Sequence, residues 1–396
     1  MNIEISKLIS NVEASVTLSL SAKAAEMKTQ GVDVCSFTAG EPDFDTPEHI
    51  RKAVADAVSA GGKVCKYTPV PGMPELREVV AQKFKNDNGL NYDSTQVVIG
   101  TGAKQIIYNA LAALVNPGNE VLFAAPYWVS YPQMTNALGG KPVSIDCTMN
   151  ENFAPSADQI RAHVNDRTKA LILCSPSNPS GTVFAKSQLE EIYSALEGTN
   201  VIVISDEIYE HLVYDGSEHV SPASISEDAY ERTITVNGMS KSFAMTGWRI
   251  GFGGGPLELI KAMSRFQSHT TSNPTTPSQI ATLAALQGDQ ACIAEMRSAF
   301  DERRQAMVSL LNAIDGVECE APKGAFYAFP KVSGLYGKGG LQGSSDFSSK
   351  LLEVHAVATI PGVAFGADDF VRMSYATSME VIEKGIGRLA EFAKSL

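Results

Sequence analysis

The sequence has no excess of basic residues: 32 Lys and Arg stand against 44 Asp and Glu, a net charge of −12. A protein that binds nucleic acid needs basic residues to neutralise phosphates, so this class is not expected. The six cysteines form no C-x-x-C pair and the six histidines no H-x-x-x-H pair, so we expect free thiols and no metal. No run of about 18 apolar residues occurs and no signal-peptide core begins the chain, which predicts a cytoplasmic protein without a membrane span.

Two nucleotide-binding fingerprints are also missing. The glycine-rich stretch at 251–255 leads into no Lys-Ser or Lys-Thr pair, so it is not a phosphate loop. No G-x-G-x-x-G motif follows an N-terminal strand, which disfavours a dinucleotide-dependent dehydrogenase. The chain does have 396 residues, 44% of them hydrophobic, which is enough for two to three domains with a large core.

Short β-branched runs alternate with helix-like segments through the middle of the sequence. Such alternation implies crossover connections and a mostly parallel sheet covered by helices. The predicted fold class is therefore α/β, with ligands expected at the carboxyl ends of the strands. The expected strands are 97–99, 121–124, 170–174, 201–205, 233–236 and 250–252, and the expected helices include 47–60, 104–114 and 187–196.

The last hundred or so residues have a different pattern, a long polar helix followed by short strands and a terminal helix, which favours a smaller α+β domain. Residues before about 47 have no local strand partner and are expected to pack on that domain. We therefore predict an N-terminal segment at 1–46, a large domain at 47–292 and a small domain at 293–396. In the small domain we expect helices at 293–314 and 379–395 and strands at 325–329 and 370–374.

Four segments bring polar residues to the carboxyl ends of the expected strands. Lys241 follows one strand, where desolvation would turn its amine into a nucleophile. Asp206 and Tyr209 follow a second strand, and Asn178, held between prolines, follows a third. The turn at 100–104 opens a helix, whose N-terminus can hold an anion. Each feature alone has an ordinary alternative: a surface lysine, a helix cap or a glycine-rich turn.

Together, the four segments match a single ligand: a phosphate, a ring nitrogen that needs an acid, a ring oxygen that needs donors and an aldehyde that binds a lysine. That ligand is pyridoxal 5′-phosphate. The segment SKSFAMTGWRIG at 240–251 carries the most specific pattern, with GEPDF at 40–44 and RMSY at 372–375. With them the sequence resembles, over nearly its whole length, the class I aminotransferases of the fold-type I pyridoxal-phosphate superfamily, and most closely their bacterial and cyanobacterial-type aspartate aminotransferase branch.

The resemblance implies roles for the cofactor site. Lys241 resembles the Schiff-base lysine that also moves a proton, Asp206 the acid that keeps the ring nitrogen protonated, and Tyr209 with Asn178 the pair on the ring oxygen. In many relatives a hydroxyl residue precedes the lysine by three positions; here it is Gly238, so the helix terminus is expected to carry more of the phosphate contact. The resemblance further implies that Ala103, Lys104, Ser240 and Arg249 bind the phosphate. Trp128 is expected to stack on the ring, although a position in the core is the alternative. Tyr67 is expected to reach the phosphate of a neighbouring subunit in a homodimer.

The resemblance also implies a substrate site. Arg372 resembles the arginine that binds the substrate α-carboxylate through a bidentate fork, beside the backbone of Gly40. Lys104 resembles a lysine that faces the distal carboxylate of dicarboxylic substrates, although a solvent-facing side chain is the alternative. The expected substrate-binding residues are thus Gly40, Lys104, Trp128, Asn178 and Arg372, with Ser15 and Thr17 closing over the distal group.

The function expected from these residues is ping-pong transfer of the amino group between aspartate or glutamate and 2-oxoglutarate or oxaloacetate. A prephenate or aromatic amino acid aminotransferase is the alternative, because Lys104 would also serve a keto acid with an extra carboxylate. A β-lyase or decarboxylase would use the same Lys241 and Asp206. A non-catalytic regulator on this fold would need a DNA-binding extension, for which the chain before the fold is too short.

Overall fold

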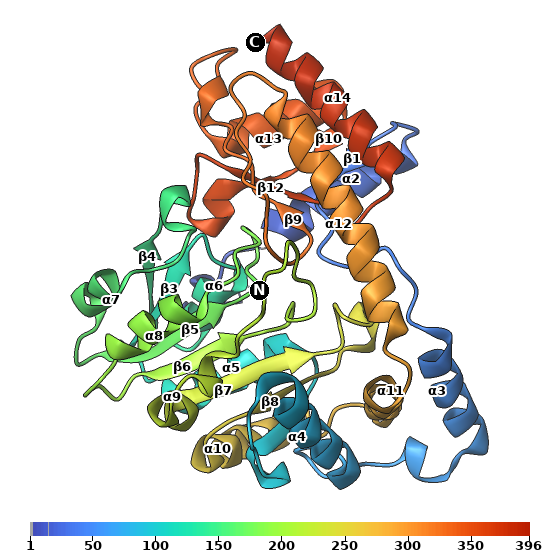
Figure 1. The fold of residues 1–396 in the computed structure, drawn as a ribbon, viewed down its shortest axis with the longest axis vertical. Helices are drawn as coiled ribbons and strands as arrows, with labels where there is room; N and C mark the ends of the chain where they lie inside the picture. Colours follow the sequence, from blue (N-terminus) through green and yellow to red (C-terminus); the bar gives the residue numbers. More distant parts are fainter. Residues whose placement is uncertain (1–2, 15) are drawn as a thin grey trace.

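The computed structural model describes residues 3–14 and 16–396. As predicted, the fold is α/β: across the described residues, strands form a seven-stranded sheet, which we call the large sheet, and sheets of three and two strands (Figure 1). The strands are β1 (Cys35–Ser36), β2 (Val97–Gly100), β3 (Glu120–Ala125), β4 (Lys141–Asp146), β5 (Thr168–Cys174), β6 (Ile202–Asp206), β7 (Thr233–Gly238), β8 (Gly251–Gly254), β9 (Tyr327–Ala328), β10 (Val357–Ala358), β11 (Ile360–Pro361) and β12 (Val371–Ser374).

The large sheet has the strand order β2-β8-β7-β6-β5-β3-β4. All neighbouring pairs are parallel except those of β8, which runs antiparallel to both β2 and β7. The carboxyl ends of β2, β5, β6 and β7 therefore meet at one edge of the sheet. The chain segments that follow these strands are the ones in which the sequence predicts the polar site residues.

Helices cover both faces of the large sheet because successive residues of its buried strands point to opposite faces. Along β5, Leu171 and Leu173 pack with α8 (Lys186–Ser194) on one face, while Ala170 and Ile172 pack with α5 (Ala103–Leu114) on the other. The helices are α1 (Lys7–Ser10), α2 (Val16–Thr29), α3 (Glu48–Ala60), α4 (Pro74–Asn88), α5 (Ala103–Leu114), α6 (Ser130–Ala137), α7 (Ala157–His163), α8 (Lys186–Ser194), α9 (Glu227–Arg232), α10 (Leu257–Ser268), α11 (Thr276–Gln287), α12 (Ala291–Asn312), α13 (Ser344–His355) and α14 (Met379–Ser395).

The smaller sheets lie with α12, α13 and α14 at the other end of the molecule (Figure 1). Residues before about 47 have a strand partner, although not a local one: β1 pairs in parallel with β10, Cys35 opposite Val357. The partner strand comes from the far end of the chain, so no local sequence pattern could reveal the pairing. The pairing joins the N-terminal segment to the C-terminal part beside the site.

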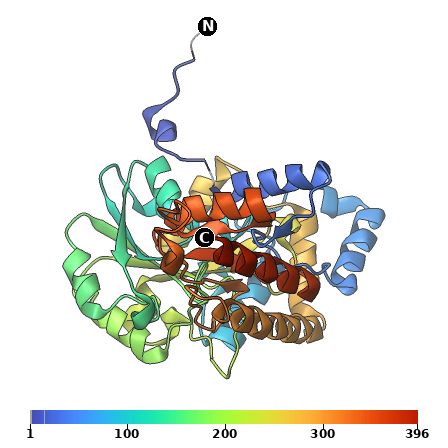
Figure 2. The same ribbon diagram turned by 90° about the horizontal axis from the view of Figure 1, so that it is seen from above.

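The segment that contains α1 projects away from the rest of the molecule and touches it through α6 (Figure 2). Its side chains at Ile3, Ile5 and Ile9 are more than half exposed. Among the described residues, no helix combines the length and the apolar character needed to cross a membrane.

Candidate active site

A cavity of about 670 Å³ opens at the carboxyl edge of the large sheet. Its walls come from the segments after β2, β3, β5, β6 and β7, from α2, α5, β1 and the chain after β1, and from Tyr327 and Arg372 of the three-stranded sheet. Among the predicted site residues, those that line it are Thr17, Gly40, Ala103, Lys104, Trp128, Asn178, Asp206, Tyr209, Ser240, Lys241, Arg249 and Arg372.

Two predicted site residues are not among the lining residues. Ser15 lies outside the residues that the structure describes. Tyr67 is 91% exposed and is absent from the cavity lining of this single chain. The prediction that Tyr67 reaches a neighbouring subunit is not tested by a single chain.

Lys241 follows β7 and directs its amine into the cavity. Its Nζ donates a hydrogen bond to the Gly40 carbonyl oxygen at 2.5 Å and lies 5.7 Å from the ring centroid of Tyr209. The pKa of this amine is lowered to about 8, mainly by desolvation; the charges of Glu41 and Asp206 oppose this shift, and those of Arg372 and Arg249 add to it. About a tenth of the amine is therefore neutral and nucleophilic at pH 7, and about half at pH 8.

Asp206 is the last residue of β6 and is only 4% exposed. Its Oδ2 accepts a hydrogen bond from the Tyr131 hydroxyl at 2.8 Å, and its Oδ1 accepts one from the Ile208 amide at 3.4 Å. Burial raises the pKa of this carboxyl to about 6 despite these hydrogen bonds. A positively charged group in the cavity would favour the ionised form, so Asp206 suits a protonated ring nitrogen.

Tyr209 and Asn178 each form a hydrogen bond with a residue of the three-stranded sheet, and sequence analysis missed both contacts. The hydroxyl groups of Tyr209 and Tyr327 are hydrogen-bonded at 2.8 Å, and Tyr327 also lines the cavity. The Asn178 Oδ1 accepts a hydrogen bond from Arg372 Nη1 at 3.1 Å. This contact orients the amide, so its NH₂ group is the end that can donate to a ligand oxygen.

Arg372, on β12, is a buried cation with neutral partners. It is 3% exposed, its Nη2 donates to the Thr38 carbonyl oxygen at 3.0 Å, and its guanidinium lies 4.5 Å from the Tyr327 ring centroid. Among the described residues, the acceptors of its guanidinium are thus an amide and a backbone carbonyl, both neutral, and its buried Nε has no hydrogen-bond partner. Since burying an unpaired charge is costly, this arrangement fits an anionic ligand group that completes the site.

A second positively charged region surrounds the N-terminus of α5. Gly102 has φ +88°, and a Cβ there would lie 2.8 Å from Arg249 Nη2, so only glycine lets the turn approach the guanidinium this closely. The first amides of α5 have no partners within the helix, and with Arg249 and Ser240 they suit a phosphate. At Gly238 a Cβ would lie 3.0 Å from Gly251 Cα and from the Ile250 carbonyl oxygen, so a hydroxyl side chain there would require β7 and β8 to shift by a few tenths of an ångström.

Lys104 and Trp128 form one wall of the cavity. The Lys104 Nζ lies 4.7 Å from the Trp128 ring centroid, a cation–π distance. Burial, followed by repulsion from Arg249, lowers the pKa of this amine. The side chain thus lies against Trp128 at the cavity wall, where it remains exposed, as a second cation apart from Arg372.

Tyr131 and Tyr327 are two site residues that sequence analysis missed. Tyr131 lies three positions after Trp128, and this short spacing at the start of α6 is the signal that could have pointed to it. Tyr327 lies on β9, within the strand expected at 325–329, but no local pattern connects it with Tyr209. Both tyrosines act through residues that were predicted.

The fold and this cavity define a class of enzyme, and comparison with known proteins identifies the family. Residues 32–389 match the model of the family "Aminotransferase class I and II". The chain belongs to this family and is a fold-type I aminotransferase.

Individual relatives match along almost the entire chain. It is 45% identical to an aspartate aminotransferase of Bacillus sp. (strain YM-2), over 98% of each chain. It is 45% identical to an aspartate/prephenate aminotransferase of Cereibacter sphaeroides, over 99% of each. Among solved structures, the aspartate aminotransferase from Thermus thermophilus with maleate has a TM-score of 0.93 and 41% identity, covering 98% of this chain and all of the other.

Proposed function

We propose that this aminotransferase moves the amino group between L-aspartate or L-glutamate and 2-oxoglutarate or oxaloacetate in a ping-pong cycle. The observation that carries the proposal is the pair of cations in one cavity, Arg372 and Lys104, on separate walls around the desolvated amine of Lys241. Two cations suit a substrate with two carboxylates. The names of the relatives and the maleate of the Thermus thermophilus structure, itself a dicarboxylate, support the same substrate class.

The residues around the cavity fit pyridoxal 5′-phosphate as the cofactor. Arg249, Ser240 and the N-terminus of α5 would hold its phosphate, and the buried carboxylate of Asp206 would face its ring nitrogen. Tyr209 and Asn178 would donate to its ring oxygen, and Trp128 would stack on the ring. When bound, this cofactor supplies an aldehyde that links to amines and a ring that accepts electrons from the substrate carbon.

The chain's own groups then divide the remaining work. Arg372 binds the substrate α-carboxylate and fixes the direction of the α-carbon, because its two hydrogen bonds to Asn178 and Thr38 hold the guanidinium plane. Lys241 Nζ, neutral in part near pH 8, accepts a proton from that carbon and returns it. Asp206, 4% exposed, holds positive charge on its side of the cavity away from water.

Replacing Arg372 with lysine is expected to raise KM for L-aspartate and to lower kcat, each by roughly tenfold or more, because a lysine ammonium cannot reproduce the bidentate fork. Steady-state rates measure both constants. Arg304→Lys is a matched control, since Arg304 is equally buried but is paired with Asp215 outside the cavity, and it should change stability rather than KM. An Arg372→Lys variant with the KM and kcat of the unmodified enzyme would contradict the assignment.

Replacing Lys104 with methionine is expected to lower kcat/KM for L-aspartate by roughly 10- to 100-fold, the value of one hydrogen bond to a charged group. The rate for L-alanine, which lacks a distal carboxylate, should change little. Lys104→Arg keeps the charge and should keep most of the preference. Equal losses for both amino acids would mean that Lys104 does not recognise the distal group.

Initial rates with a panel of keto acids test the proposal as a whole. L-aspartate as donor should give oxaloacetate with 2-oxoglutarate as acceptor, at a higher kcat/KM than with pyruvate. Prephenate belongs in the panel because of the aspartate/prephenate relative, and a rate with prephenate above that with 2-oxoglutarate would favour that alternative. Release of pyruvate and ammonia without a new amino acid would instead indicate a β-lyase.

We also propose a cytoplasmic homodimer with shared active sites, supported by the exposed Tyr67 and the free cysteines. The proposed division into residues 1–46, 47–292 and 293–396 is supported by the separate sheets and by the β1–β10 pairing. Sedimentation of the enzyme with the mass of two chains would support the homodimer. Weaker cofactor binding by a Tyr67→Phe variant would support the shared site.

A further inference from the structure

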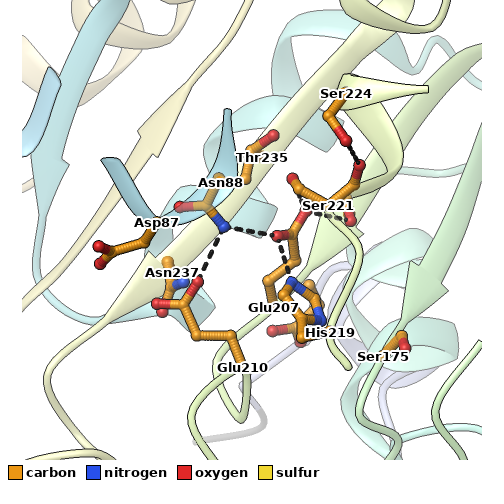
Figure 3. A network of polar contacts seen from close by, with 12 residues as sticks. Asp87, Asn88, Ser175, Glu207, Glu210, His219, Ser221, Ser224, Thr235 and Asn237 are labelled. Atoms are coloured by element: carbon orange, nitrogen blue, oxygen red, sulfur yellow. Dashed lines mark hydrogen bonds and ion pairs between the residues drawn. The ribbon is translucent and has the colours of Figure 1, made fainter. Parts of the chain in front are cut away.

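A network of buried polar groups is centred on Glu207, which follows Asp206 in the chain (Figure 3). Glu207 is 0% exposed and does not line the cavity. Its carboxylate accepts four hydrogen bonds: at Oε1 from Ser205 Oγ (2.8 Å) and Ser221 Oγ (2.9 Å), and at Oε2 from His219 Nε2 (2.8 Å) and Asn88 Nδ2 (3.3 Å). The lone pairs of this carboxylate are thus satisfied by donors from several elements.

Glu210 repeats this arrangement one turn further along the chain. It is 7% exposed, accepts a hydrogen bond from Asn88 Nδ2 at 2.9 Å and contacts the ammonium group of Lys83. Lys83 is itself 6% exposed and donates to Asn88 Oδ1 at 2.8 Å. Asn88 and Lys83 both belong to α4, so this helix joins the two carboxylates.

The side chains of the turn after β6 face two different environments, the cavity and the packed region beside α4. Asp206 and Tyr209 line the cavity, while Glu207 and Glu210 bind α4 and the segment near Ser221. The backbone is held as well, because the Glu207 amide donates to the Val236 carbonyl oxygen of β7 at 2.9 Å. Any movement of Glu207 would therefore turn its two cavity-facing neighbours.

A metal ion does not explain the network. Glu207, Glu210 and His219 offer ligand atoms within 4.8 Å of one another. However, the Lys83 ammonium already contacts Glu210 as the local cation, and His219 Nε2 must carry a proton, since a carboxylate can only accept. Nor is stability alone a sufficient reason, because apolar residues of similar size often stabilise a core as well as buried charges do.

We propose that Glu207 is a positioning residue, which, through its four donors, fixes the turn so that the Asp206 carboxylate and the Tyr209 hydroxyl keep their directions into the cavity. The inference rests on the proposed function, in which these two side chains contact the cofactor. A shift of Asp206 by a fraction of an ångström weakens its hold on a ring nitrogen, and small misplacements of this kind are costly in catalysis.

The test compares Glu207→Gln with Glu120→Gln in the cofactor-loaded enzyme. Glu120 is a matched control: it is 3% exposed and binds Asn165, Arg167 and Lys141, but it begins β3 at the opposite edge of the large sheet. Both variants should lower the thermal stability of the cofactor-free chain. Only Glu207→Gln should lower kcat, by roughly 10- to 100-fold, with a smaller change in KM. Only Glu207→Gln should also move the pH midpoint of the visible absorbance upward, because less positive charge is then held on the ring.

The outcomes separate this inference from the proposed function. If the unmodified enzyme, loaded with pyridoxal 5′-phosphate, has no pH-dependent visible absorbance, the proposed function fails. If it has one, and Glu207→Gln matches Glu120→Gln in kcat and in the midpoint, the positioning role alone is overturned.

A second pair of variants covers the case in which Glu207→Gln does not fold. His219→Gln keeps an N–H donor for Glu207, whereas His219→Leu removes it. The glutamine variant should keep a kcat and a pH midpoint close to those of the unmodified enzyme. The leucine variant should have a lower kcat and a pH midpoint shifted upward. Equal behaviour of the two His219 variants would overturn the proposal.

Discussion

Replacing Lys241 with alanine is expected to lower turnover by roughly 10⁴-fold or more, because in the proposed function this lysine is both the amine that links to the cofactor and the base that moves the substrate proton. The groups proposed to hold the phosphate, Arg249 and the α5 N-terminus, remain, so the variant should still bind the cofactor. Lys241→Arg is the matched variant for charge: it keeps a cation but offers no neutral amine. It should be as inactive as the alanine variant, and substantial turnover by either would contradict the role.

The pH dependence of cofactor capture provides a second test of the role of Lys241. Since this amine has a pKa of about 8, about half of it is neutral at pH 8, and the neutral fraction levels off roughly one to two pH units higher. The rate at which the cofactor-free protein captures pyridoxal 5′-phosphate should follow the same curve. A capture rate still rising steeply at pH 10 would indicate an ordinary, solvated lysine.

Replacing Asp206 with asparagine is expected to lower kcat by roughly 10³-fold or more, because a neutral amide cannot keep a ring nitrogen protonated inside a buried cavity. Asp206→Glu retains the charge and should retain more activity than the asparagine variant. The absorbance of the loaded enzyme and kcat measure the effect. An asparagine variant with nearly full activity would mean that some other group holds the ring nitrogen.

The same substitution should not destabilise the cofactor-free chain. Burial raises the pKa of Asp206 from 3.8 to about 6, so ionising it in the folded protein costs about 3 kcal/mol. For an acid with a raised pKa, stability is fully present at low pH and is lost as pH rises through the folded value. At neutral pH Asp206→Asn should therefore unfold at the same temperature as the unmodified chain or a higher one, and calorimetry can test this.

The residues that follow single strands could be predicted from the sequence. Lys241, Asp206 and Asn178 each come shortly after a buried β-branched run, and parallel strands bring their carboxyl ends to one edge. Lys104 could be predicted as a site residue because the glycine-containing turn at 100–104 indicates the start of α5. In each case a local pattern and one topological rule were sufficient.

Residues that act through distant partners could not be predicted in this way. Tyr131 meets Asp206 across 75 positions and Tyr327 meets Tyr209 across 118, and only tertiary packing brings them together. Glu207 looks like an ordinary charged residue in the sequence, yet it is fully buried, because its partners come from α4 and from the segment at 219–221. The edge strand β4 was missed for a different reason: its residues are mostly exposed or half-exposed, include Lys141 and Pro142, and form no β-branched run.

The most direct test of the central claim is to locate the covalent link. The purified protein is incubated with pyridoxal 5′-phosphate, reduced with borohydride and digested, and the labelled peptide is sequenced by mass spectrometry. A single pyridoxyl group on Lys241 is the expected result. A protein that takes up no cofactor, or carries the label on another lysine, would contradict the account.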